Sequence, residues 1–321
     1  MGASQRYLIV LGLLGIWLAV PAAAGDPIQL YEYMQVHMGL PVRVAVYTAD
    51  ERAARDAARA AFTRIAALDR MMSDYRPDSE LRRLGSGAWI PVSRELFHTI
   101  ALATAIAEQT DGAFDPSTGP FVALWREARK TGRLPDRAAL DAARARVGWR
   151  KIQLDNARRR IRLDAPDMRL DLGGIAKGYI LQEALRTIRA RGIAQALLEA
   201  GGDILVGDAP PRRSGWRIET EGADSTFAER ASRLTNAAIA TSGSAAQFVE
   251  IDGVRYSHVI DPRTGLGATN QYVARVIAPD GATADALATA LAVLGPEAVP
   301  RLRARFPRII VTVTLSPAPT P

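Results

Sequence analysis

The absence of cysteine is the feature that most constrains how this chain can fold. None occurs among its 321 residues, which excludes a disulfide framework, a thiolate metal site and a cysteine nucleophile. No cysteine is available for lipidation near the N-terminus either. The chain is nevertheless long enough to bury a substantial core, either as one large domain or as two lobes that share it.

The first 24 residues resemble an export signal. Arg6 precedes an apolar run from Tyr7 to Val20, and the small residues that follow fit a signal-peptidase site after Ala24. An uncleaved anchor helix is the alternative, because the run is nearly long enough to cross a bilayer. We expect a periplasmic or otherwise exported protein, with membrane association only through an uncleaved signal segment or through a partner. The expected division is a signal peptide at 1–24, one domain at 25–315 and a loose proline-rich tail at 316–321.

Basic residues outnumber acidic ones, 41 against 34, and give a formal net charge of +7. Such an excess suits an anionic ligand, a nucleic acid or an acidic membrane surface. The arginines are scattered through helical stretches, and no basic block is interleaved with aromatic residues that would stack on bases. We therefore interpret the charge as solvated helix faces and expect no nucleic-acid partner.

Strand and helix patterns follow one another without an internal repeat or a long linker. The chain opens with a strand hairpin, after which Asp50 caps a long helix that runs toward Tyr75. In the last third, the Asp252-Gly253 pair suits a type I′ hairpin turn. The pattern predicts an α/β fold of the α+β kind with a mixed sheet. Further helices are expected after Ser93, after Asp136 and from Ala284, and two short strands within 151–164.

The stretch "LDLGGIAKGY" combines residue types that suit phosphate binding. An apolar strand is expected to end at Asp171, and Gly173 and Gly174 would let the backbone approach a ligand before a helix begins near Ala176. Helix N-termini attract phosphate, and Lys177 adds a mobile positive charge. The spacing is neither that of a P-loop nor that of a dinucleotide fingerprint. A plain strand-to-helix turn is the alternative.

Asp285 and Thr289 lie four residues apart on an expected helix and so share one face near its N-terminus. With a carbonyl from a glycine turn and several waters, these two oxygen ligands would suit a hard cation such as Mg²⁺. An ordinary carboxylate favoured by the helix dipole is the alternative.

The stretch "YSHVIDPRTG" places one of only three histidines beside a carboxylate. His258 precedes Asp261 by three residues, and that carboxylate can fix the tautomer of the imidazole and raise its basicity. This is a general-base arrangement, with a structural histidine as the alternative. Two other stretches are weaker: "DGAFDPSTGP", in which Phe114 would stack on a planar ring if exposed, and "TSG" at 241–243, whose hydroxyls could donate to a ligand.

Taken together and in this order, the motifs resemble the ApbE family, the flavin transferases that act as FAD:protein FMN transferases. The resemblance runs from residue 38 to about residue 295 and also includes "HMG", "MMSDYRPDSEL", "EAGGDI" and "ADALATALAVLG". It implies a two-lobed α/β fold related to the tunnelling fold, with FAD between the lobes and Mg²⁺ on its pyrophosphate. It also implies transfer of FMN from FAD to a threonine or serine of an acceptor protein that carries a Gly-Ala-Thr motif, with release of AMP.

The resemblance assigns roles to individual residues. Asp285 and Thr289 match side-chain ligands of Mg²⁺, and Gly174 matches a position that offers its backbone carbonyl. His258 matches the candidate base, Asp261 its orienter or a charge near the metal, while we expect Arg263 to brace the turn. Met38 and Tyr75 match positions that line the flavin, and Asp171 and Lys177 match further FAD contacts. The segment that approaches the nucleotide is matched by Ala113, Phe114 and Asp115.

Two other functions use the same motifs. An FAD pyrophosphatase would let water attack the same phosphates and give FMN and AMP, and a non-catalytic protein would simply bind FAD. The chain itself contains Gly-Ala-Thr at 267–269 and at 281–283. We do not interpret the second as a self-modification site, because Thr283 suits the N-cap of the helix that carries Asp285.

Overall fold

The computed structural model describes residues 27–220, 223–243 and 248–315. The expected signal peptide at 1–24 and tail at 316–321 lie outside these residues, as do the first two residues of the expected domain. Within the described part, no helix has both the length and the apolar character needed to cross a membrane.

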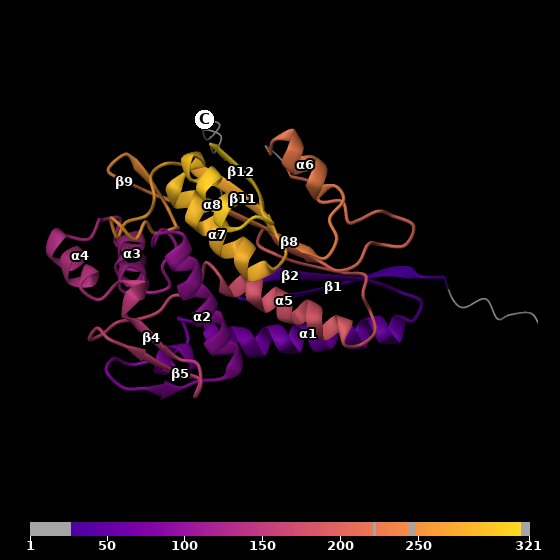
Figure 1. The fold of residues 1–321 in the computed structure, drawn as a ribbon, viewed down its shortest axis with the longest axis horizontal. Coiled ribbons are helices and arrows are strands. Elements are labelled where there is room, and N and C mark those ends of the chain that lie inside the picture. The colour runs from indigo at the N-terminus through magenta and orange to yellow at the C-terminus, as the bar shows by residue number, and fades with distance from the viewer. Residues whose placement is uncertain (1–26, 221–222, 244–247, 316–321) are drawn as a thin grey trace, which may run out of the picture.

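A seven-stranded sheet forms the centre of the fold, in the order β1-β2-β6-β7-β8-β11-β12 (Figure 1). Every neighbouring pair in it is antiparallel. The expected α/β class is confirmed in its α+β form, but the sheet is antiparallel rather than mixed as expected. Parallel pairing in the described residues is limited to one isolated bridge, between Ser86 and Leu163. The strands are β1 (Gln29–His37), β2 (Leu40–Thr48), β6 (Ala196–Ala200), β7 (Asp203–Val206), β8 (Ala237–Gly243), β11 (Tyr272–Ala278) and β12 (Ile310–Leu315).

Helices cover one face of this sheet and build the main core. The buried residues of β2, such as Val42, Val44 and Val46, alternate along the strand and pack against this helical layer. On the opposite face, Ala45 and its neighbours pack against Trp216 and α6 (Ser225–Ala231). The helices of the main layer are α1 (Glu51–Met72), α2 (Arg94–Gln109), α5 (Ala176–Arg189) and α7 (Gly281–Leu294), and α8 (Val299–Arg305) follows α7.

A second lobe lies at one end of the sheet, on the left in Figure 1. Its own core joins Phe121 and Trp125 of α3 to Tyr256 of the β9–β10 hairpin. The sheet and this lobe together match the expected two-lobed architecture. The elements of this lobe are α3 (Gly119–Thr131), α4 (Arg137–Arg144), β9 (Phe248–Ile251) and β10 (Val254–Ser257). A small sheet of β3 (Ile90–Pro91), β5 (Arg160–Leu163) and β4 (Ile152–Asp155) has its buried residues in the main core.

Local sequence signals predicted several of these elements correctly. The Asp50 carboxylate accepts from the backbone N–H of Arg52 at 2.7 Å and caps α1. Ser93 and Asp136 cap α2 and α4 as expected. Asp252 and Gly253, with φ of 51° and 72°, form the predicted two-residue turn between β9 and β10.

Two expectations about local structure were also wrong. Residues 168–172 form no strand, and the backbone N–H of Asp171 instead donates to the carbonyl of Pro116 at 2.8 Å. The helix that carries Asp285 begins at Gly281 rather than at Ala284, and its N-cap is Asp280. Thr283 is therefore not the cap: its own backbone N–H donates to the Asp280 carboxylate at 2.8 Å.

Candidate functional site

Two glycines allow the N-terminal turns of α5 and α7 to touch. A methyl group added at Gly178 would lie 2.0 Å from the carbonyl oxygen of Gly281, and one added at Gly281 would lie 2.3 Å from that of Gly178. No larger residue fits either position without a backbone shift. This close approach lets the backbone N–H of Gly178 donate to a carboxylate oxygen of Asp285, at 3.2 Å.

A lysine and two buried carboxylates meet at this junction. Lys177 of α5 pairs with Asp203, at the start of β7, and its Nζ lies 3.6 Å from Oδ1 of Asp285. Asp203 is 1% exposed and Asp285 is 4% exposed. The backbone N–H of Thr241 in β8 also donates to Asp203, at 3.4 Å. We call Lys177, Asp203 and Asp285 the buried charge cluster.

The buried charge cluster contains two acidic groups and one basic group. Burial, reinforced by the neighbouring Asp285, raises the pKa of Asp203, and burial likewise raises the pKa of Asp285. Burial alone would lower the pKa of Lys177, but the two carboxylates outweigh that effect and raise it. One ammonium, on a side chain that is 24% exposed, therefore faces two buried carboxylates, an arrangement that favours a further cation.

The predicted metal ligands are brought together beside this cluster. A methyl group added at Gly174 would lie 2.9 Å from the hydroxyl oxygen of Thr289, so loop and helix are in direct contact here. Thr289 lies one helical turn after Asp285 on α7. A carboxylate, a hydroxyl and a backbone carbonyl are all oxygen ligands of the kind that Mg²⁺ prefers. Among the residues described, no three His, Cys, Asp or Glu side chains gather as a metal site, so an ion held here would depend on this mixed set and on water.

The predicted nucleotide segment at 113–115 is largely buried. Ala113 and Phe114 are each 4% exposed, and Phe114 packs against Gly174 within the main core rather than standing exposed as a stacking surface. Asp115 accepts from the backbone N–H of Ser117 at 2.8 Å and from that of Trp149 at 3.1 Å. Burial raises the pKa of Asp115. Asp115 therefore stabilises this segment by joining the backbone at Ser117 to that at Trp149. Its contact with FAD stays a prediction.

Tyr75 and Asp171 meet through an arginine that the sequence did not single out. The Arg126 guanidinium lies 3.8 Å from the ring centroid of Tyr75, 2.5 Å from the Asp74 carboxylate and 3.9 Å from that of Asp171. Burial, together with the nearby Asp74, raises the pKa of Asp171 to about 6. The predicted contact residues are thus part of a charged network.

Met38 occupies the turn between β1 and β2. Its φ of 54° is left-handed, and Gly39 follows with 72°, which again makes a two-residue hairpin turn. The side chain is half-buried and packs against the main core. Its predicted place beside the flavin stays a prediction.

His258 directly follows β10 and its residue is exposed. Asp261 is buried and its carboxylate accepts from the Arg263 guanidinium, at 2.9 Å from Nε and 2.7 Å from the terminal nitrogen. The expected bracing of this turn by Arg263 is therefore confirmed. The roles of His258 as base and of Asp261 as its orienter stay predictions.

Asp203 is the site residue that sequence reasoning missed. It stands in "EAGGDI", just before three apolar residues of β7. A carboxylate buried in a strand is costly unless it has a partner. That isolated acidic residue was the available signal, although its partners lie far away in sequence.

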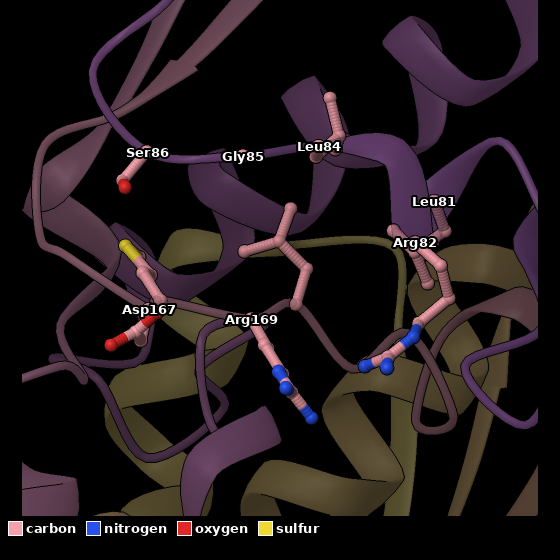
Figure 2. Close-up of a pocket in the computed structure, with 9 residues that line it drawn as sticks. Leu81, Arg82, Leu84, Gly85, Ser86, Asp167 and Arg169 are labelled. Atoms are coloured by element: carbon pink, nitrogen blue, oxygen red, sulfur yellow. The ribbon is translucent and has the colours of Figure 1, made fainter. Parts of the chain in front are cut away.

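A cavity of about 250 Å³ opens beside the Asp171 segment (Figure 2). Figure 2 shows Arg82 and Arg169 extending toward the same side of it. Its volume lies below the usual range of ligand pockets, so it would hold only part of a dinucleotide. The lining residues are Leu81, Arg82, Leu84, Gly85, Ser86, Asp167, Met168, Arg169 and Leu170.

Comparison with known proteins gives a consistent result. The sequence pattern of the ApbE family matches residues 38–312. An FAD:protein FMN transferase of Klebsiella pneumoniae is 34% identical over 273 residues, which cover 81% of this chain and 77% of that protein. One from Treponema pallidum is 32% identical over 321 residues, covering 93% and 89% of the two chains.

Solved structures agree with the sequence relatives. The crystal structure of the ApbE protein of Thermotoga maritima superposes with a TM-score of 0.77 at 28% identity, covering 90% of this chain and 97% of that one. The flavin transferase ApbE of Vibrio cholerae gives a TM-score of 0.76 at 28% identity, covering 91% and 98%. The chain described here therefore belongs to the ApbE family.

Proposed function

We propose that this chain transfers FMN from FAD to a threonine or serine hydroxyl of an acceptor protein, releases AMP, and requires Mg²⁺. The observation that carries the proposal is the buried charge cluster beside Gly174 and Thr289, where one lysine faces two buried carboxylates. Relatives that share most of the chain are named FAD:protein FMN transferase. The oxygen ligands and the excess of acidic over basic groups fit a hard cation.

In the proposed reaction, the acceptor hydroxyl attacks the phosphorus that belongs to the FMN half of FAD. A new phosphoester bond forms to the acceptor oxygen, and the phosphoanhydride bond to AMP breaks, so that AMP leaves with the bridging oxygen. His258 would take the hydroxyl proton, since histidine is the side chain that most often serves as a general base. Its exposed place after β10 supports this role, because a protein acceptor must reach it.

The residues that would hold Mg²⁺ are Asp285, Thr289 and the carbonyl of Gly174. When bound, the ion supplies positive charge that neutralises phosphate oxygens. Lys177 keeps the two buried carboxylates together and adds its own positive charge to the same site. The N-terminal turn of α5, which begins at Ala176, adds its dipole.

The acceptor and the location belong to the proposal as well. We propose that the acceptor carries a Gly-Ala-Thr motif. We also propose that the enzyme is exported, which the signal-like sequence of residues 1–24 supports.

The test is to incubate the purified protein with FAD, Mg²⁺ and an acceptor domain that bears a Gly-Ala-Thr motif. The acceptor is weighed by intact mass spectrometry while AMP and free FMN are quantified. A mass gain of one FMN, matched by AMP and dependent on Mg²⁺, supports the transferase. AMP with free FMN and no adduct would favour the pyrophosphatase instead, and intact FAD that stays bound would favour a flavin-binding protein.

Two substitutions test the site assignment. Asp285→Ala should abolish Mg²⁺-dependent turnover and weaken FAD binding, whereas His258→Ala should slow turnover while FAD still binds. Asp56→Ala and His98→Ala change the same residue types at exposed positions on α1 and α2 and serve as controls. Wild-type turnover in both site variants would refute the assignment.

A further inference from the structure

Tyr75 presents its ring to solvent although one face of it is covered. The residue is 77% exposed, yet the Arg126 guanidinium lies 3.8 Å from its ring centroid. A guanidinium at this distance makes a cation–π contact with the face that it covers. The ring is therefore held from one side, while most of its remaining surface faces solvent.

Arg126 also joins two segments that are distant in sequence. It lies in α3, pairs with Asp74 at 2.5 Å and reaches the Asp171 carboxylate at 3.9 Å. Asp171 in turn accepts from the backbone N–H of Gly173 at 2.7 Å and so shapes the loop that leads to Gly174. One side chain thus connects the Tyr75 segment to the loop that is expected to offer a metal ligand.

The environment of Arg126 strengthens these contacts. The side chains of Arg126, Asp74 and Asp171 are 32%, 18% and 17% exposed, so solvent screens their charges less than it would at an open surface. A planar guanidinium can stack on a ring and bridge carboxylates at its edge at the same time. A lysine ammonium is a point charge and cannot take over both contacts in one position.

We infer that Arg126 is a positioning residue for flavin binding. It holds the Tyr75 ring as a flat surface on which a planar ring of FAD stacks, and it fixes that surface relative to the Asp171 loop. The inference rests on the proposed function, because it takes FAD as the ligand.

The test is a double-mutant cycle on FAD affinity, measured by calorimetry with Mg²⁺ present. Arg126→Gln should raise the Kd for FAD about five-fold, the loss expected for one cation–π contact, and Tyr75→Leu should raise it at least as much. In the Tyr75→Leu background, Arg126→Gln should add less than about two-fold, because its effect acts through the ring. Turnover at saturating FAD should fall by less than about two-fold in Arg126→Gln, since the substitution removes binding rather than chemistry.

Two further variants separate this role from a purely structural one. Arg126→Lys keeps the charge and should restore only part of the affinity, because it lacks the planar group. If Arg126→Gln does not fold, the affinity of Arg126→Lys for FAD still tests the role of the planar guanidinium. Arg129→Gln removes the same charge from an exposed position on α3 and should bind FAD like the wild type.

The outcomes distinguish this inference from the proposed function. If the wild type does not bind FAD, the proposed function fails. If the wild type binds FAD and Tyr75→Leu weakens binding, but Arg126→Gln binds normally or acts additively with Tyr75→Leu, only the role of Arg126 is overturned. Full affinity in Arg126→Lys would reduce that role to charge alone and overturn the stacking argument.

Discussion

The contact between Gly178 and Gly281 makes a sharp prediction for Gly178→Ala. The added methyl carbon would lie 2.0 Å from the Gly281 carbonyl oxygen, whereas carbon–oxygen contacts close at about 3.3 Å or more. The two helices must therefore separate by roughly 1.3 Å at their N-termini. Both partners are backbone, so no side-chain rotation relieves the clash.

We expect this separation to cost about 3 kcal/mol of the free energy of unfolding, at the upper end of the usual overpacking range. At about 2.1 cal/mol/K of unfolding entropy per residue, that loss lowers the Tm of a chain of this length by about 4 to 5 °C. It should also weaken Mg²⁺-dependent turnover, because the separation pulls Asp285 away from the Gly178 N–H that it accepts from.

Thermal unfolding followed by circular dichroism measures this effect. Gly85→Ala is the matched control, because a methyl group there meets nothing within 4 Å and the glycine has no left-handed φ. The control should equal the wild type or exceed it slightly. A Gly178→Ala protein that melts within about 2 °C of the wild type would show that the helices are not in close contact and would refute the reasoning.

Three further predictions follow from buried charges. Burial raises the pKa of Asp171 to about 6, so ionising this carboxyl costs more free energy in the folded than in the unfolded protein. The stability present below about pH 4 is therefore lost as the pH rises through 6, and over that range Asp171→Asn should become about 3 kcal/mol more stable relative to the wild type. A stability difference between the two proteins that does not change with pH in urea denaturation would contradict this. Asp115→Asn should lower the free energy of unfolding by about 1–3 kcal/mol at neutral pH. The amide has only one oxygen, whereas the two carboxylate oxygens accept separately from Ser117 and Trp149. An unchanged midpoint of urea denaturation would count against this. Lys177→Met should lower the free energy of unfolding by about 3–5 kcal/mol, because it leaves two buried carboxylates without their ammonium. This loss should grow from pH 5 to pH 8 as those carboxylates ionise, and a loss that does not depend on pH in the same assay would argue against the cluster.

The local elements were predictable because their signals lie within a few residues of one another. A capping carboxylate such as Asp50 and a turn pair such as Asp252-Gly253 act on the adjoining backbone, and both predictions held. The N-cap of α7 was missed because Asp280 and Thr283 are both good capping residues. Only the start of the helix, which depends on packing against α5, decides between them.

The assembly of the site was less predictable, since it depends on contacts between distant segments. Asp203 meets Lys177 across 26 residues, and Asp285 meets Gly178 across 107. Nothing in the local sequence around Arg126 indicates that its guanidinium would reach Tyr75. The resemblance to the ApbE family predicted that Asp285 and Thr289 are metal ligands. The excess of buried acidic groups beside them becomes visible only in the folded chain.

The most direct test of the account is the mass of a Gly-Ala-Thr acceptor after incubation with FAD and Mg²⁺, compared between the wild type and Asp285→Ala. The account predicts an acceptor heavier by one FMN moiety with the wild type, and no adduct with the variant or after chelation of the metal. An equal adduct with both proteins would contradict the role of the buried charge cluster. Absence of the adduct with the wild type, while AMP and free FMN accumulate, would contradict transfer itself.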